Sequence, residues 1–344
     1  MKLTDTVTLA YILLLVSAVR PAKGADCLSK DSTVSMRGLF ALTVVLHHLS
    51  AYAYSGMTFP YFSYVGFISV SVFFFLSGYG LMTRFGQQGK EYLSTVLTRR
   101  IPRMIVIYLI ATVIYALAFM AMGYNVTLRY VLWSFVSGSP LALNSWYILT
   151  LVLLYLCFCA VFALFGKNKL LSVAATTLVT LCYILFMHAK GYDYHWYMST
   201  PGFAVGIFWA AYKDRIHSFA EKKWWLWTAI IAVLFLAAYR LSGITMIWSV
   251  PGLNLGSRLA AGALFPILVV LLSMKLTLGG KVLTFLGGIS LELYLFHGLV
   301  YAFLRSSLVY IQNDALWVWM SIVLSVIAAY IFNKVFRIIP KLQK

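Results

Sequence analysis

Residues 36–48 read MRGLFALTVVLHH, an apolar run with one arginine near its start and two histidines at its end. Arg37 and His48 are eleven residues apart, which on an α-helix is three turns plus about 20°, so their side chains share a face. A rise of about 1.5 Å per residue separates them by roughly 16 Å along the axis. The stretch therefore predicts a helix that carries ionisable side chains at two depths.

The rest of the chain has the composition of a membrane protein. Of its 344 residues, 62% are apolar and only 10% are charged, with a mean hydropathy of +0.89, far outside the range of soluble domains. We expect an all-α fold, a polytopic transmembrane helical bundle. Residues 31–340 would form one transmembrane domain, preceded by an apolar segment and basic linker over residues 1–30.

Ten apolar runs are long enough to suggest about ten membrane-spanning helices, since a span needs about 20 residues. They lie near residues 38–54, 62–82, 104–122, 145–165, 170–188, 198–212, 224–240, 258–274, 282–304 and 315–333.

The basic residues fix the expected orientation. A net charge of +18 could suggest nucleic-acid binding, but the lysines and arginines lie in short loops, as the positive-inside rule predicts. From Arg20 onward, alternate loops hold 21 basic residues on one side and 5 on the other. We therefore expect membrane lipids and no nucleic acid as partners, with both ends of the ten-span core in the cytoplasm.

Two shorter apolar segments are harder to place. Residues 7–19 are short for a span and resemble the apolar part of a signal peptide. Arg20, Pro21 and Lys23 stand where a cleavage site needs small neutral residues, so we favour an uncleaved interfacial or extra N-terminal helix. For residues 126–137 we expect a half-inserted or surface helix.

Ionisable residues at membrane depth are expensive and suggest function by default. Taken singly, Arg37 could be an interfacial anchor and His48 a satisfied histidine inside the bundle. Together, and beside His47 on a neighbouring face, they leave a functional role and a structural role both open. Glu292 and His297 add two more ionisable groups in the ninth run; they lie five residues apart on different faces, and either could meet the first helix.

Two further patterns follow this first run in the sequence. Residues 73–80 read FFFLSGYG, in which Ser77 and Gly78 would let a helix or a ligand approach closely. Arg99, Arg100 and Arg103 then precede the third run. Arginine forks suit phosphate, although positive-inside anchoring explains such a cluster equally well. No CxxC or HExxH motif is present, and we expect no metal site.

In this order, these motifs resemble the acyltransferase 3 family of bacterial multipass membrane proteins. The resemblance runs from about residue 31 to residue 333 and is most specific over residues 36–103. The matching residues are Arg37, Gly38 and His48, then Phe74 to Tyr79, then Arg99, Arg100 and Arg103, and more weakly Ser145, Trp146 and Tyr147, Gly288 to Ser290, Tyr294, Leu295 and His297.

The resemblance implies an O-acetyltransferase-like enzyme of the bacterial cytoplasmic membrane. It would move an acyl group, usually acetyl, from cytoplasmic acyl-CoA to a hydroxyl of an envelope glycan or lipid-linked sugar, with polysaccharide-assembly proteins as partners. His48 and Arg37 take the family's functional positions. Because His47 stands beside His48, two histidines are candidates for one role. After Trp146 and Tyr147 some members carry a carboxylate, which this chain lacks.

The order of these residues along the chain suits acyl-CoA as the donor. Arg99, Arg100 and Arg103, with Arg37, would hold the CoA phosphates, and the pantetheine arm would pass Ser77 and Gly78. His48 would be the general base, because an imidazole pKa near 6.5 suits proton transfer at neutral pH. An acyl-histidine intermediate is also chemically feasible. Supporting or substrate contacts would come from Trp146, Tyr147, Glu292, Tyr294 and His297.

Two other functions remain open. In a transporter or exporter of an envelope precursor, the same buried charges would line a pathway. A structural scaffold for polysaccharide assembly would tolerate change at Arg37 and His48 together. The sequence does not identify the acceptor or the acyl group.

Overall fold

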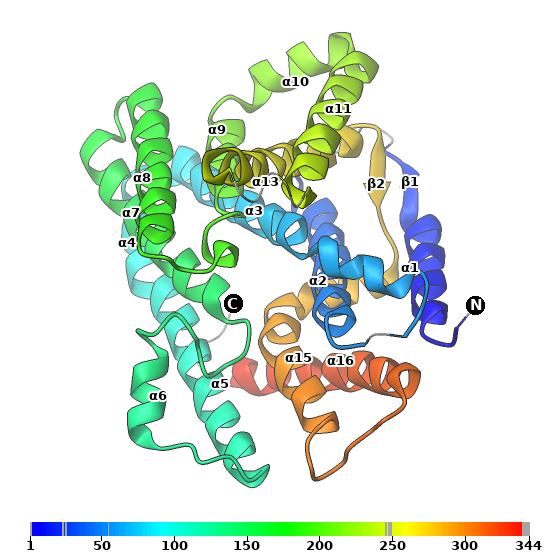
Figure 1. The fold of residues 1–344 in the computed structure, drawn as a ribbon. Coiled ribbons are helices and arrows are strands. Elements are labelled where there is room, and N and C mark those ends of the chain that lie inside the picture. The colour runs from blue at the N-terminus through cyan, green and yellow to red at the C-terminus, as the bar shows by residue number, and fades with distance from the viewer. Residues whose placement is uncertain are drawn as a thin grey trace.

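The computed structural model describes residues 2–338, apart from residues 23, 25, 54, 245 and 247–249. Lys23, Lys341 and Lys344, which contribute to the expected cytoplasmic charge, lie outside the described residues. Each of the ten apolar runs coincides with helical structure, and the protein is an all-α, polytopic helical protein (Figure 1). The helices concerned are α2 (Lys30–Ser50), α3 (Gly66–Gln88), α5 (Ile101–Ala121), α7 (Trp146–Phe165), α8 (Lys169–Ala189), α9 (Pro201–Ala211), α11 (Trp224–Gly243), α13 (Pro251–Ser273), the pair α14 (Lys281–Gly288) and α15 (Ser290–Leu304), and α16 (Asp314–Ile338).

Not all ten segments are equally long or apolar. Within the described residues, seven helices could cross a bilayer by length and composition, and the α14–α15 pair, bent by 79°, makes eight. The other two predicted spans differ for visible reasons. The first half of α2 carries Lys30, Asp31 and Arg37, and α9 has only 11 residues, about 16 Å at the usual helical rise.

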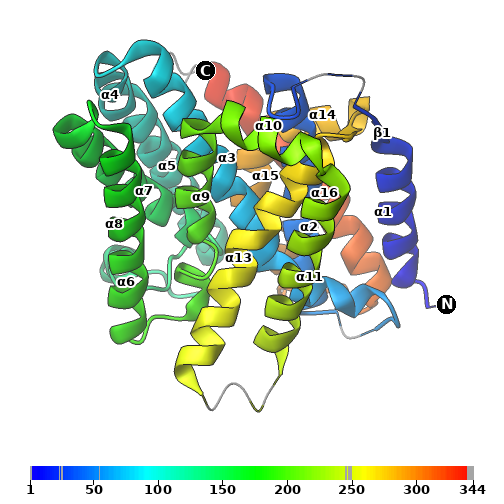
Figure 2. The same ribbon diagram turned by 90° about the horizontal axis from the view of Figure 1, so that it is seen from above.

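The two ends of the bundle differ in composition. One end carries α4 (Glu91–Thr95), α10 (Lys213–Lys222) and the last described residues of α16, and α6 (Leu128–Ser134) lies toward the other end (Figure 2). The first end also holds the loops rich in lysine and arginine, and we call it the basic face. The seven-residue α6 is a short helix, as expected for residues 126–137, and is far too short to span.

Residues 7–19 form most of α1 (Asp5–Ala18), which runs alongside the bundle at its edge (Figure 2). The hydroxyls of Tyr11 and Thr43 are 2.8 Å apart and link α1 to α2. The helix leads into β1 (Val19–Pro21), which pairs antiparallel with β2 (Leu276–Leu278) on the basic face. At its other end, the Asp5 carboxylate accepts hydrogen bonds from the loop before the 3₁₀ helix η1 (Phe59–Tyr64).

Glycines allow two pairs of helices to pack with their backbones almost touching. Between α3 and α9, a Cβ added at Gly202 or Gly206 would lie 2.3 or 2.1 Å from a carbonyl oxygen of α3. Between α2 and α14, a Cβ at Gly38 would lie 2.0 Å from the Leu283 oxygen, and one at Gly287 would lie 1.9 Å from the Val34 oxygen. Small residues are used in this way where membrane helices gain stability from van der Waals contact.

Candidate active site

A cavity of about 1530 Å³ opens among α2, α3, α5, α7 and α15 toward the basic face. It is larger than the usual range for drug-sized ligands and could hold a coenzyme. Eight of the predicted site residues line it: Arg37, Ser77, Arg99, Arg100, Arg103, Tyr147, Glu292 and Tyr294. Segments that are far apart in sequence therefore form one chamber, as the proposed donor site requires.

Local structure determines where the arginines of this cavity lie. Arg37 lies on α2 next to Gly38, whose close approach to α14 holds this part of the helix against α14. Arg99 and Arg100 end a π-helical turn, η2 (Val96–Arg100), and α5 then begins at Ile101, with Pro102 in its first turn. Such turns add a residue to the helix and occur frequently at functional sites. Here the turn precedes Arg103, one turn into the next helix.

The cavity lining is strongly cationic. Five arginines contribute to it, Arg84 in addition to the four predicted, against the single carboxylate of Glu292. None of the five forms an ion pair with a described residue. The Nε atoms of Arg37 and Arg103 are buried without a hydrogen-bond partner among the described residues. Buried donors of this kind are costly unless a ligand satisfies them, so the lining is suited to an anion.

Glu292 does not neutralise this charge by a direct ion pair. The side chain is only 2% exposed, and its Oε1 accepts a hydrogen bond of 2.9 Å from Asn333 Nδ2 on α16. Asn333 is itself buried. The carboxylate is thus directed by a neutral amide of the last helix, a contact that positions α15 against α16.

Histidines gather at the other end of α2. The His48 ring lies 4.8 Å from the His47 ring and 5.1 Å from the His297 ring, measured between centroids. Of the two ionisable residues in the ninth run, His297 is therefore the one that meets α2. His48 is half-buried, in the last turn of α2, and lines neither cavity described here.

Hydrogen bonds fix the tautomer of two of these rings. A carbonyl oxygen only accepts, so His47 Nδ1 donates to Phe62 O at 3.1 Å and His297 Nδ1 donates to Leu293 O at 3.1 Å. In the neutral ring this leaves Nε2 with a free lone pair. For His297, Nε2 is buried without a partner in the described part of the chain, so the His48–His297 pair has a vacant proton acceptor.

Tyr294 lines the cavity where the cavity approaches the histidines. Its hydroxyl donates to the backbone oxygen of Asn144, and its ring lies 5.4 Å from that of Tyr147 and 6.2 Å from that of His297. Asn144 has a left-handed backbone with φ of 64°, which asparagine tolerates better than most residues. This contact lies between the cationic cavity and the histidines.

Besides the three histidines, the structure places two predicted site residues away from the cavity. Gly78 faces α9, where an added Cβ would lie 2.2 Å from Phe203 O, so its small size serves helix packing. Trp146 is buried among Phe74, Tyr147, His195 and Trp196. It supports the wall behind Tyr147 without reaching the cavity.

Several residues of the site escaped prediction. Arg84 and Tyr155 line the cavity. Arg84 lies near the end of α3, just before the basic stretch that contains Arg99, and this proximity in sequence was the available signal. Asn333 could have been noticed as a buried amide in an apolar run. His195, which contacts Trp146, gave no signal because it lies in a polar connection between helices.

A second pocket, of about 680 Å³, opens on the opposite face between the far ends of α2, α5, α15 and α16. No residue lines both cavities in the part of the chain that the structure describes. The histidine pair lies between them, since Tyr301 of the second pocket is 6.0 Å from His297, centroid to centroid.

Comparison with known proteins gave one family. A family model described as an acyltransferase domain matches residues 35–334, nearly the whole chain. The match includes all thirteen predicted site residues. No curated protein and no solved structure matched.

Proposed function

The chain belongs to the acyltransferase 3 family, and from this we propose that it transfers an acetyl group from cytoplasmic acyl-CoA to a hydroxyl of a cell-envelope sugar. The family match makes it a membrane acyltransferase. The donor, the acceptor and the catalytic residues are our proposal. The observation that carries it is the cationic cavity, with five arginines and two buried, unpartnered guanidinium Nε atoms.

The cavity suits the donor. CoA carries several phosphate charges at one end and a neutral thioester at the other. Arg84, Arg99, Arg100 and Arg103 would bind the phosphates through charge-assisted hydrogen bonds. The pantetheine arm would extend past Ser77 and Tyr147 toward Tyr294, whose ring lies 6.2 Å from that of His297, so that the thioester faces the histidine pair. The cavity would open to the cytoplasm of a bacterial cell, as the excess of basic residues on this face supports.

Transfer requires one base and no metal. The imidazole of His48 would remove the proton from an acceptor hydroxyl as the oxygen attacks the thioester carbonyl. The carbon–sulfur bond then breaks, the oxygen–acyl bond forms, and the CoA thiolate takes the proton from the imidazolium. His297 lies against His48 and would share or orient this proton. The acceptor would be an envelope glycan or a lipid-linked sugar, delivered by polysaccharide-assembly proteins.

Acyl-CoA binding provides the direct test of the donor site. In purified protein, we expect Arg103→Ala and Arg37→Ala to weaken acetyl-CoA binding about tenfold or more, because a hydrogen bond to a charged group contributes roughly 1.5–3 kcal/mol. Arg215→Ala is the matched control, since Arg215 is exposed on α10 of the same face. Equal binding by all three variants would contradict the donor site.

The acceptor reaction is tested in cells. Mass analysis of envelope glycans, with and without the intact gene, should show the loss of about one acetyl mass per modified repeat. Unchanged glycans would contradict the proposed reaction.

Transport is the second candidate, and one observation favours it. The two cavities open on opposite faces and approach each other at the histidine pair, an arrangement that an alternating-access transporter would also have. In proteoliposomes, sugar flux without acyl-CoA would favour transport. Acetyl transfer or acetyl-CoA hydrolysis without flux would favour the enzyme.

A further inference from the structure

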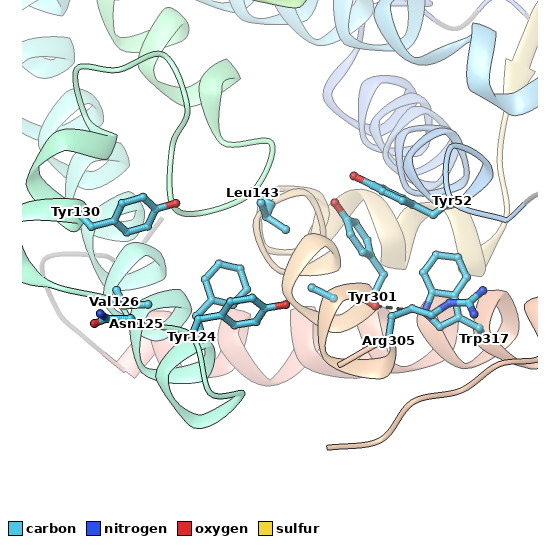
Figure 3. Close-up of a pocket in the computed structure, with 11 residues that line it drawn as sticks. Tyr52, Tyr124, Asn125, Val126, Tyr130, Leu143, Tyr301, Arg305 and Trp317 are labelled. Atoms are coloured by element: carbon cyan, nitrogen blue, oxygen red, sulfur yellow. Dashed lines mark hydrogen bonds between the residues drawn. The ribbon is translucent and has the colours of Figure 1, made fainter. Parts of the chain in front are cut away.

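The pocket on the opposite face is lined mainly by aromatic side chains (Figure 3). Its walls come from the far ends of four helices and from the loop around α6. The residues that line it are Tyr52, Phe119, Tyr124, Asn125, Val126, Tyr130, Leu143, Tyr301, Ala302, Arg305 and Trp317. Four tyrosine hydroxyls and an asparagine amide give this aromatic lining hydrogen-bonding capacity.

Two of the tyrosines are directly connected to the histidine pair. Tyr301 follows His297 by four residues, one turn of α15, and the two rings are 6.0 Å apart. Tyr52 follows His48 by four residues and lies in the turn just after α2 ends at Ser50. The rings of Tyr52 and Tyr301 are 5.4 Å apart, just as those of His48 and His297 are 5.1 Å apart. A molecule against the tyrosine pair is therefore next to His297, whose ring lies 5.1 Å from that of the candidate base His48.

The opposing wall is also aromatic. Tyr124 and Tyr130 are 60% and 51% exposed, and their hydroxyls point toward Leu143 and Tyr301 across the pocket (Figure 3). Tyrosines that only anchor a protein at the membrane interface point outward to the headgroups. Because these tyrosines face one another across a hollow, their exposed rings and hydroxyls are directed at an occupant.

The pocket offers an occupant no free charge. Arg305 is the one charged residue that lines it among the described residues, and its guanidinium is already engaged. It pairs with Asp314, donates to Gln312 O at 3.2 Å and lies 4.7 Å above the Trp317 ring. The second oxygen of Asp314 accepts a hydrogen bond from Ser55 N at 3.1 Å. An acidic or a cationic ligand would find no unpaired counter-ion.

From these observations we infer that the pocket of Tyr52, Tyr124, Tyr130 and Tyr301 is the acceptor site and takes an uncharged sugar residue. The sugar ring would stack on tyrosine rings, and the hydroxyls would exchange hydrogen bonds with the tyrosine hydroxyls and Asn125. The inference rests on the proposed transfer reaction and specifies its acceptor as a neutral hexose or deoxyhexose, not a uronic acid or an amino sugar with a free amine.

The first test locates the acetyl group. Cells expressing the wild-type chain, Tyr52→Ala, Tyr301→Ala or Tyr301→Phe are compared by tandem mass spectrometry of their envelope glycans. We expect the acetyl group on an uncharged sugar residue, and an acetylated fraction lowered about tenfold by the alanine variants, the effect of losing one or two hydrogen-bonding and stacking contacts. Tyr61→Ala is the control, since Tyr61 is 69% exposed in η1, outside the pocket.

Acetyl-CoA binding by each purified variant shows that the donor site is still folded. An acetyl group on an acidic or amino sugar overturns the inference, as does wild-type acetylation by Tyr52→Ala and Tyr301→Ala. If the wild-type chain acetylates no glycan, the proposed function fails as well, and that result is distinct from the other two.

A second test changes the charge of the pocket. Asp314→Asn keeps the shape of the side chain but removes the negative charge that neutralises Arg305. With acetyl-CoA and purified protein, the wild type should prefer methyl glucoside over methyl glucuronide as an acceptor probe. We expect Asp314→Asn to shift this preference toward the glucuronide at least fivefold. Preference for the glucuronide in the wild type would overturn the inference.

Discussion

Some side chains of the candidate site could be predicted from the sequence, and others could not. Arg37 and the downstream arginines were found because a charged group near the hydrocarbon needs a reason, and they line one cavity. The tautomers of His47 and His297 could not be predicted, because they depend on the carbonyl groups that Phe62 and Leu293 present in the fold. Gly78 illustrates the reverse problem, since a glycine that admits a ligand and one that admits a helix look alike in sequence.

The two adjacent histidines should respond differently to mutation. We expect His48→Ala to lower acyl transfer by about 10²–10⁴-fold, the usual contribution of a general base. His47→Ala should keep most of the transfer rate and instead lower thermal stability, because the His47 ring donates to Phe62 O and packs against Gly66.

The measurement is the transfer rate per inserted protein molecule, with His217→Ala as the control, since this histidine of α10 lines neither cavity. A His48→Ala protein with normal rate would remove the base from the scheme. A larger loss from His47→Ala would exchange the two roles.

Whole helices were easier to predict than their packing. Hydropathy located all ten runs because the backbone must satisfy its own hydrogen bonds in lipid. It could not show that the ninth run bends by 79° between α14 and α15, nor that a π-helical turn precedes α5. Backbone contacts at Gly38 and Gly287 depend on which helices become neighbours. No local sequence pattern predicts that pairing.

Enlarging a contact glycine should destabilise the α2–α14 packing. We expect Gly287→Ala to lower the free energy of unfolding by about 1–3 kcal/mol, the usual effect of overpacking, because its Cβ would lie 1.9 Å from a backbone oxygen that cannot rotate away. Gly86→Ala on α3 is the matched control, since nothing lies within 4 Å of its Cβ and alanine favours a helix by about 1 kcal/mol. Thermal unfolding in detergent should show opposite shifts; equal shifts would mean that helix propensity alone decides both.

Attachment of α1 should depend on pH. Hydrogen bonds from the backbone N–H groups of Thr58 and Phe59 lower the pKa of Asp5 below its ordinary value of 3.8. A carboxyl with a lowered pKa stabilises the fold above its unfolded-state pKa, and this contribution is lost as pH falls through the folded-state value. The wild type should therefore hold α1 fully above about pH 5 and progressively release it below about pH 4.

Proteolysis of the loop that contains Met57 and Thr58 measures this release. Asp5→Ala should be cleaved rapidly at neutral pH and show little further change on acidification. Cleavage of the wild type that is equally slow at pH 3 and pH 7 would show that the carboxylate does not hold the loop.

At the scale of the molecule, the loops that the basic residues place on one side of the membrane also lie at one end of the fold. The loops that were assigned to one side by their lysines and arginines gather at the basic face, and α6 lies toward the other end (Figure 2). The existence of two cavities could not be predicted, because their walls combine residues from up to five segments. Only the cationic one had a chemical indication in the sequence.

Labelling of single cysteines tests which face is cytoplasmic. In a chain whose four native cysteines are replaced by alanine, Tyr124→Cys should react with a membrane-impermeant thiol reagent added to intact cells. Gln87→Cys, exposed at the basic face, should react only after the membrane is permeabilised. The reversed pattern would place the cationic cavity outside the cell and make cytoplasmic acyl-CoA an impossible donor.

The contact between Tyr294 and Asn144 has an electrical consequence. Where the structure describes the chain, the two cavities share no lining residue, and this contact lies between the cationic cavity and the histidines. The described residues therefore line two separate cavities, one at each face, and not one continuous channel. A bilayer that holds a potential of 100 mV drives each elementary charge with about 2.3 kcal/mol, and a wet channel of this size would discharge it. Two separate cavities give each face its own recess without forming a channel of that kind.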